Sequence, residues 1–413
     1  MNKRNYYILL ILFFISFSSV SFAQKKKNVS SKKAIKKEIS NARANIKRGR
    51  NLEQAETAMR NLLKDSANIE NDKIWLTLFD AVKKQYEQLN EKLYLGQQSD
   101  TAKFFTNTLH MFDVLESLDS VKVNSDKGEK SKSSYRKKHS AYLHQHRTNL
   151  FGGGGYYIQK NDYANAYKFF NAYLDCVVHP LFSDFDYANT DKRLSDAAYW
   201  AVYCGYKLSR PDIIDKYSPL ALKNTKTDVY MQQYIAESYL LKKDSSNYCA
   251  TLEKGFDKYP NHAYFFTHLA VYYANKGMYK NILNISERAL ALNPNNLSAL
   301  LTRSSALLHE EEYDECVKVC DKAISIDDTK AIAYINAGLA YYNRTISLAN
   351  KKKHSQKENE EIITLYKRAL PYLSKYRQLM PDEKKVWALP LYNIYLNLNM
   401  GNEFEEIEKL LTK

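Results

Sequence analysis

The sequence predicts an all-α protein, a superhelical solenoid of antiparallel helix pairs, from three observations. The chain has 413 residues, more than one hydrophobic core normally organises. It contains only 12 Gly and 8 Pro, which fits long helices with short connections better than a β protein with many tight turns. Pro260-Asn261 and Pro294-Asn295 are 34 residues apart. A fixed period of this size is typical of stacked helical repeats, in which each unit buries its apolar face against its neighbours.

Residues 1–23 have the three parts of a secretory signal peptide. Lys3 and Arg4 give a positive start, residues 6–20 are uncharged and largely apolar, and Ser21-Phe22-Ala23 supplies small residues for a signal peptidase. We therefore expect an exported protein, periplasmic or secreted after cleavage near Ala23. An uncleaved membrane anchor is the alternative, because the apolar run is only slightly shorter than a spanning helix.

Residues 24–38 are expected to form a basic arm before the first helix. Residues 25–37 carry seven Lys and no acidic side chain, within a chain whose formal net charge is +15. A solubilising tail is the simplest interpretation. The alternative is peripheral contact with an anionic envelope surface, either glycan or lipid. Nucleic acid is the least expected partner of an exported protein, and we predict none.

Residues 39–117 are expected to hold amino-terminal helical repeats, because apolar and small residues recur there with helical spacing. One helix pair is predicted from Ile39 to Leu62 and another from Trp75 to Phe112. Residues 118–138 are rich in Ser, Lys and Asp with few bulky side chains, so we expect a flexible linker there. The main superhelix then occupies residues 139–413.

The clearest repeats lie in residues 229–330, as three consecutive units that begin at Val229, Ala263 and Leu297. Within each unit, small residues let the helices approach and bulky residues fill the remaining space. Pro260 and Pro294 end the second helix of the first two units, and Asp328 stands at that position in the third. The unit from Ala263 shows this alternation at Phe266, Leu269, Ala270, Tyr273, Ile282, Ser286, Ala289 and Pro294. This pattern resembles the tetratricopeptide repeat (TPR), and the whole chain resembles exported bacterial TPR-containing proteins.

The resemblance implies a concave groove, lined by positions 2, 5, 9, 12 and 13 of the first helix of each repeat, that receives a peptide or a partner helix. Carried over by position, the predicted groove residues are Tyr199, Tyr203, Tyr206, Lys207, Tyr230, Glu237, Tyr264, Asn275, Tyr342, Asn343, Tyr392 and Tyr395. Tyrosines offer a large contact area at low entropy cost. The alternative is that some of these rings pack between repeats. No Lys stands at groove position 5, so the carboxylate-gripping subclass of TPR proteins is not predicted.

No catalytic, metal-binding or cofactor-binding residue is predicted. Gly152 to Gly155 lack the spacing of a phosphate-binding loop, so close helix packing is favoured over a hinge. The loop with Asp184, Asp186, Asn189 and Asp191 departs from the calcium-binding pattern, and a polar loop is favoured. Cys316 and Cys320, two of five Cys, are expected to be small buried residues.

Three hypotheses of function follow. The leading one is an exported TPR scaffold that binds a protein or peptide partner in the cell envelope through an aromatic-rich concave groove. The second is a cell-envelope binder of anionic glycan or lipid that uses the basic arm. The third is an enzyme with an unfamiliar site, which we do not expect because no catalytic motif stands in the chain.

Overall fold

The computed structural model describes residues 32–124, 129–349 and 355–411, and within these ranges the chain is helical without a strand. The all-α fold class is confirmed. The predicted signal peptide and the start of the basic arm, up to residue 31, lie outside the described residues. Residues 32–38 do not form a separate arm, because they already belong to the first helix, over residues 32–48.

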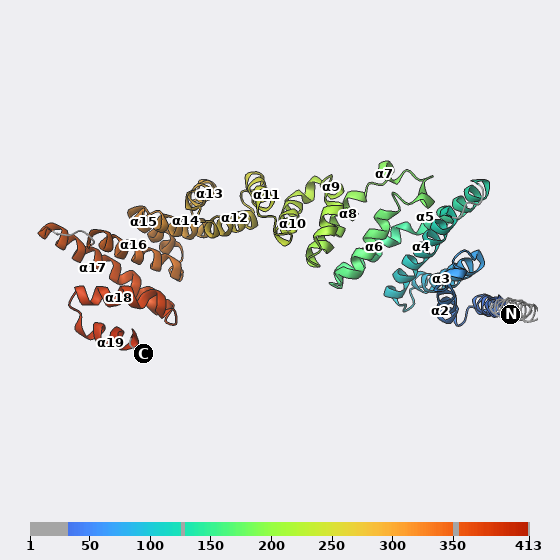
Figure 1. The fold of residues 1–413 in the computed structure, drawn as a ribbon, viewed down its shortest axis with the longest axis horizontal. Coiled ribbons are helices and arrows are strands. Elements are labelled where there is room, and N and C mark those ends of the chain that lie inside the picture. Colours follow the sequence, from blue (N-terminus) through green and yellow to red (C-terminus); the bar gives the residue numbers. More distant parts are fainter. Residues whose placement is uncertain (1–31, 125–128, 350–354, 412–413) are drawn as a thin grey trace, which may run out of the picture. The chain divides into compact units, whose positions relative to one another are not determined.

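The described chain separates into two compact units, one ending at Tyr234 and the other beginning at Ile235. Figure 1 labels the helices of both units. The first unit holds the helix over residues 32–48 and, up to Tyr234, α10. Between them lie α2 (Leu52–Leu63), η1 (Ser66–Asn68), α3 (Asp72–Tyr94), α4 (Thr101–Asn124), α5 (Glu129–Gln159), α6 (Tyr163–Asp175), η2 (Pro180–Phe182), α7 (Tyr187–Thr190), α8 (Leu194–Lys207), α9 (Pro211–Ala221) and η3 (Thr225–Thr227). Each of α2 to α5 packs on the next, and α8 packs on both α6 and α9.

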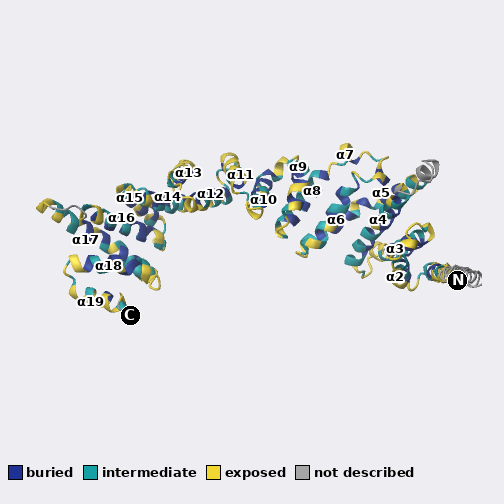
Figure 2. Cartoon of the chain, viewed as in Figure 1, coloured by how far each residue is buried: buried dark blue, intermediate teal, exposed yellow. Residues whose placement is uncertain are grey.

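The second unit contains the rest of α10 (Asp228–Leu241) and the helices that follow. These are α11 (Ser245–Lys258), α12 (Ala263–Asn275), α13 (Tyr279–Leu292), α14 (Leu297–His309), α15 (Tyr313–Ile326), α16 (Ala331–Ala349), α17 (Gln356–Leu379), α18 (Lys384–Asn397) and α19 (Gly401–Leu411). From α11 onward, each helix packs on the next. Figure 2 shows the buried residues on the faces where neighbouring helices meet.

The period of the two Pro-Asn pairs is visible in the helix boundaries of the second unit. Second helices begin at Ser245, Tyr279 and Tyr313, so the interval between successive starts equals the interval from Pro260 to Pro294. The turn before each of them places one residue in the left-handed region, with φ of 59° at Lys243, 68° at Gly277 and 61° at Glu311. Only Gly277 is the residue type that adopts this conformation without strain, so the helix packing on either side holds the other two turns in place.

The segment expected to be a flexible linker, residues 118–138, is largely helical, which corrects that expectation. α4 continues to Asn124 and α5 begins at Glu129. Leu118 and Asp119 are buried, and Arg136 donates from Nε to Asp119 Oδ1 over 2.8 Å. A polar composition suggested disorder, but one apolar side chain and one buried ion pair between the two helices hold this segment.

The close packing predicted for the glycine run is confirmed at its two central residues. A Cβ on Gly153 would lie 2.6 Å from the Phe169 ring, and a Cβ on Gly154 would lie 2.5 Å from the Phe170 ring. Both distances are shorter than any carbon–carbon contact, so these residues let α5 and α6 approach each other. The run is therefore a packing device inside a continuous helix rather than a hinge.

Cys316 and Cys320 are fully buried in α15, as predicted for small core residues. They belong to an apolar cluster with Leu300, Leu307 and Ala337. All five Cys of the chain are free thiols in the structure. None of the described helices combines the length and the apolar character that a bilayer crossing requires.

Candidate partner-binding face on α8

One face of α8 gathers four of the predicted groove residues. Tyr199, Tyr203, Tyr206 and Lys207 stand at i, i+4, i+7 and i+8, which places them on one stripe of the helix. The other stripe carries small and apolar residues that are buried against α6 and α9 (Ala197, Ala198, Ala201, Val202, Cys204 and Gly205). Because that stripe is fixed in the core, the tyrosine stripe is turned away from it.

Tyr234 of α10 lies at the centre of these rings. Its ring stacks on Tyr206 with centroids 4.7 Å apart, and it contacts Tyr203 at 6.0 Å and Tyr199 at 6.2 Å. Tyr163, at the start of α6, meets Tyr203 edge-on at 5.8 Å. We call Tyr163, Tyr199, Tyr203, Tyr206, Lys207 and Tyr234 the α8 aromatic face. All of it lies in the first unit.

Sequence reasoning missed Tyr163 and Tyr234, because neither stands at a groove position of its repeat. The spacing of Tyr230 and Tyr234, four residues apart on α10, was the available signal. Tyr230, a predicted groove residue, is 46 % exposed, whereas Tyr234 is buried. Burial, together with the hydrogen bond to Tyr199, raises the pKa of the Tyr234 hydroxyl above its ordinary value, so this group stays protonated.

Lys207 supplies the only cation among the residues of the α8 aromatic face. Its Nζ lies 5.4 Å from the ring centroid of Tyr203, 5.5 Å from that of Tyr206 and 6.0 Å from that of Tyr163. These distances are at the outer limit of a cation–π contact. No carboxylate among the described residues pairs with Lys207. The face therefore offers ring surface, phenol hydroxyls and one ammonium group to a partner.

Glu237 and Tyr264 form a separate pair in the second unit. The Tyr264 hydroxyl donates to Glu237 Oε1 over 2.8 Å, and the Tyr264 ring lies 4.1 Å from the His268 ring. Asn275 is exposed near the end of α12, and Asn343 is half-buried on α16. The structure thus brings together the predicted residues of α8, and separately Glu237 with Tyr264.

Tyr342 and Tyr395 were predicted to line the groove, and the structure corrects this. Both are buried members of the apolar cluster of α16, α17 and α18. The Tyr342 hydroxyl accepts a hydrogen bond from Asn393 Nδ2 over 2.6 Å. Tyr392 is half-buried, with its ring 4.7 Å from Phe404. Large rings at these positions fill the space between the last helix pairs, so the alternative of packing between repeats holds there.

No protein-family model and no curated protein matches the sequence. Solved structures with a similar fold are TPR proteins. The C-terminal part of a TPR repeat-containing protein from Cytophaga hutchinsonii has 14 % identity and a TM-score of 0.45, over 63 % of this chain and 93 % of that one. A TPR repeats protein from Bacteroides fragilis has 16 % identity and a TM-score of 0.29, over 64 % and 98 %. YrrB, a TPR protein with an unusual peptide-binding site, has 16 % identity and a TM-score of 0.29, over 60 % and 93 %.

This chain's own helices assign the fold. Its second helices begin at a constant interval, and small and bulky residues of the repeat pattern are buried between the helices. The chain folds as a TPR protein. Ile39, Ala42, Ala55 and Met59, which the sequence assigns to a further helix pair, are buried in the first helices.

The TPR array carries an insertion between α6 and α8, which includes the loop considered for calcium binding. The carboxylates of Asp186 and Asp191 in that loop are already engaged. Asn189 Nδ2 donates to both oxygens of Asp186 over 3.0 Å, and Asp191 Oδ2 accepts from Arg147 Nη1 and from the Tyr173 hydroxyl, each over 2.6 Å. Among the described residues, no group of His, Cys, Asp or Glu is arranged to hold a metal ion. These contacts anchor the loop to α5 and α6.

Proposed function

We propose that this chain is an exported TPR scaffold that binds a protein or peptide partner in the cell envelope through the α8 aromatic face. The observation that carries the proposal is the cluster of the three α8 tyrosines around Tyr234 with the ammonium of Lys207 at its edge. Half-buried tyrosines that are held by their neighbours lose little entropy on binding and bury large areas. Export is proposed from residues 1–23, and no catalytic role is proposed.

The test is crosslinking of the tagged, full chain in living cells, followed by mass spectrometry of the captured partner. We expect a double variant, Tyr203→Ala with Tyr206→Ala, to lower the affinity for that partner by about a hundredfold, because each central ring of an interface contributes on the order of 1–2 kcal/mol. Tyr94→Ala is the matched control, since Tyr94 is 86 % exposed on α3, outside the face.

Two results would contradict the proposal. One is a partner whose capture is the same with the double variant as with Tyr94→Ala. The other is capture that depends on residues 24–38 and falls steeply with salt, because this result would favour the anionic glycan or lipid hypothesis. Circular dichroism of the double variant should show unchanged helicity. This control separates a loss of partner binding from unfolding of the chain.

A further inference from the structure

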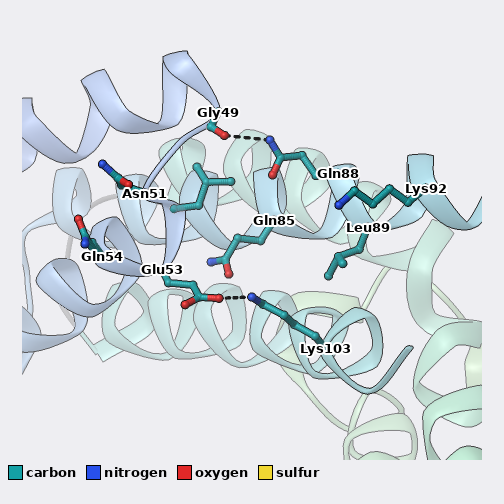
Figure 3. Close-up of a pocket in the computed structure, with 10 residues that line it drawn as sticks. Gly49, Asn51, Glu53, Gln54, Gln85, Gln88, Leu89, Lys92 and Lys103 are labelled. Atoms are coloured by element: carbon teal, nitrogen blue, oxygen red, sulfur yellow. Dashed lines mark hydrogen bonds and ion pairs between the residues drawn. The ribbon is translucent and has the colours of Figure 1, made fainter. Parts of the chain in front are cut away.

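A cavity of about 390 Å³ opens in the first unit between the turn before α2, α3 and α4 (Figure 3). Its lining is mostly polar, with Glu53 and Gln54 from α2, Gln85, Gln88 and Lys92 from α3, and Lys103 from α4. Gln85, Gln88 and Lys92 stand at i, i+3 and i+7, which places all three on one face of α3. This cavity is distinct from the α8 aromatic face.

The Gln85 side chain is buried, with 5 % of it exposed, and its amide orientation is fixed by Glu56. Gln85 Nε2 donates to Glu56 Oε2 over 2.8 Å. Burial raises the pKa of the Glu56 carboxyl, but the surrounding His110, Arg60 and Gln85 outweigh it and lower the pKa to about 2. An ionised carboxylate only accepts hydrogen bonds, so the amide nitrogen must face Glu56. The Gln85 carbonyl oxygen is therefore the end that faces the cavity (Figure 3).

Gln88 is oriented by the same rule. Its Nε2 donates to the backbone carbonyl of Gly49 over 3.0 Å, and a carbonyl can only accept. Gly49 has φ of 62°, so the turn that presents this carbonyl depends on glycine. The Gln88 carbonyl oxygen is left as the free end of the side chain and points into the cavity (Figure 3). The cavity thus contains two acceptors whose positions are set by the hydrogen bonds of their own amide nitrogens to Glu56 and to Gly49.

The charges around the cavity are of both signs. Glu53 pairs with Lys103 across it (Figure 3), and the Glu53 side chain remains 68 % exposed. Lys92 lies one turn beyond Gln88 and has no carboxylate partner among the described residues. A ligand therefore meets two carbonyl oxygens that require hydrogen-bond donors, and the Lys92 ammonium, which requires an anion. It also meets the Glu53 carboxylate, which can accept further hydrogen bonds beside its pair with Lys103.

We propose that this cavity binds a small zwitterion of the amino-acid or short-peptide class. The ligand's ammonium group takes the Gln85 and Gln88 carbonyl oxygens and Glu53, and its carboxylate faces Lys92. An apolar ligand would leave the two amide acceptors unpaired, and a simple anion would face them with no donor to offer. This site is additional to the proposed partner-binding function and does not depend on it.

The experiment is isothermal titration calorimetry of the full chain with four probes: glycine, glycylglycine, N-acetylglycylglycine and glycylglycinamide. We expect at least one of the two zwitterions, glycine and glycylglycine, to bind. The tighter of the two then identifies the class as amino acid or peptide. Acetylation removes the ammonium group and amidation removes the carboxylate, so each is expected to weaken the binding of glycylglycine by about tenfold or more, the effect of one charge-assisted hydrogen bond.

Lys92→Ala locates the ligand's carboxylate, and Lys73→Ala is the matched control. Lys73 is an exposed lysine of the same helix that does not line the cavity, so both variants remove one surface charge from α3. Lys92→Ala should weaken the zwitterion about tenfold and leave glycylglycinamide unchanged, whereas Lys73→Ala should change neither. No heat with either zwitterion at millimolar concentration, or equal loss with the two variants, would overturn the proposal.

Discussion

Replacing Arg147 by methionine is expected to lower the free energy of unfolding of the first unit by about 3–5 kcal/mol. The Arg147 side chain is buried on α5. Its Nη1 donates to Asp191 Oδ2 over 2.6 Å and its Nη2 to the Tyr173 carbonyl over 3.0 Å. The guanidinium carbon also lies 3.7 Å from the Tyr173 ring centroid and 4.0 Å from that of Tyr187. This side chain joins the insertion between α6 and α8 to the helix pair, beside the hydrogen bonds from Tyr173 to Asp191 and between His144 and Tyr187.

Methionine keeps much of the aliphatic volume of arginine, so the loss should come from the charge. Without the guanidinium, the half-buried carboxylate of Asp191 keeps only the Tyr173 hydroxyl and the Arg193 N–H as donors. A carboxylate that is left without its cation in a partly desolvated place is far more unfavourable than the intact pair is favourable. The two tyrosine rings also lose the cation that they enclose.

Arg210→Met is the matched control, because Arg210 and Asp212 form an Arg–Asp pair of the same length, 2.6 Å, on the surface. Their side chains are 55 % and 60 % exposed, so this change is expected to alter the free energy of unfolding by no more than about 1 kcal/mol. Urea unfolding followed by circular dichroism measures both variants. Similar losses in the two would show that Arg147 is not a structural anchor.

The pH dependence of stability follows from the same pair. Burial raises the pKa of the Asp191 carboxyl, but Tyr173 and Arg147 outweigh it and hold the pKa below its ordinary range. A lowered folded-state pKa contributes stability that is present above the unfolded value, near 3.9, and is lost as the pH falls through the folded value. The difference between the native chain and Arg147→Met should therefore be largest near neutral pH and shrink below about pH 4. An unchanged difference down to pH 2 would contradict this account.

The features that could be predicted from the sequence are those that repeat. The constant spacing of the Pro-Asn pairs located the helix pairs, and the alternation of small and bulky residues located their core, because both depend on neighbours that are near in the sequence. The position of a tyrosine in its repeat did not separate Tyr203, on a free stripe of α8, from Tyr342, in the core. Whether a tyrosine at this position is half-buried or fully buried depends on the residues that the neighbouring helices place against its ring.

The cavity beside α3 could not be predicted for a related reason. Gln85 and Gln88 are ordinary helix residues in the sequence, and nothing local distinguishes them. Their carbonyl oxygens face the cavity because Glu56, on α2, and Gly49, in the turn before α2, take their amide nitrogens. The prediction of a flexible linker over residues 118–138 was wrong for the same reason. The ion pair of Arg136 with Asp119 joins two helices, and the composition of the segment does not indicate such a contact.

Alanine at Gly154 and at Gly155 should change stability in opposite directions, although the two residues are neighbours in the same helix. In the interior of a helix, alanine is favoured over glycine by about 1 kcal/mol. At Gly155 a Cβ would meet nothing within 4 Å, so Gly155→Ala should raise the free energy of unfolding by about 0.5–1 kcal/mol. Thermal and urea unfolding of the two single variants measure the effect.

At Gly154 the same gain is opposed by a larger loss. The added Cβ would lie 2.5 Å from the ring of Phe170, which is fully buried and cannot turn aside without moving its neighbours. Overpacking of a filled core costs about 1–3 kcal/mol, so Gly154→Ala should be destabilising on balance by about 1–2 kcal/mol. Pairing Gly154→Ala with Phe170→Leu should recover part of this loss, because leucine vacates the space that the Cβ needs. Two stabilising single variants would mean that α5 and α6 do not approach as closely as the structure shows.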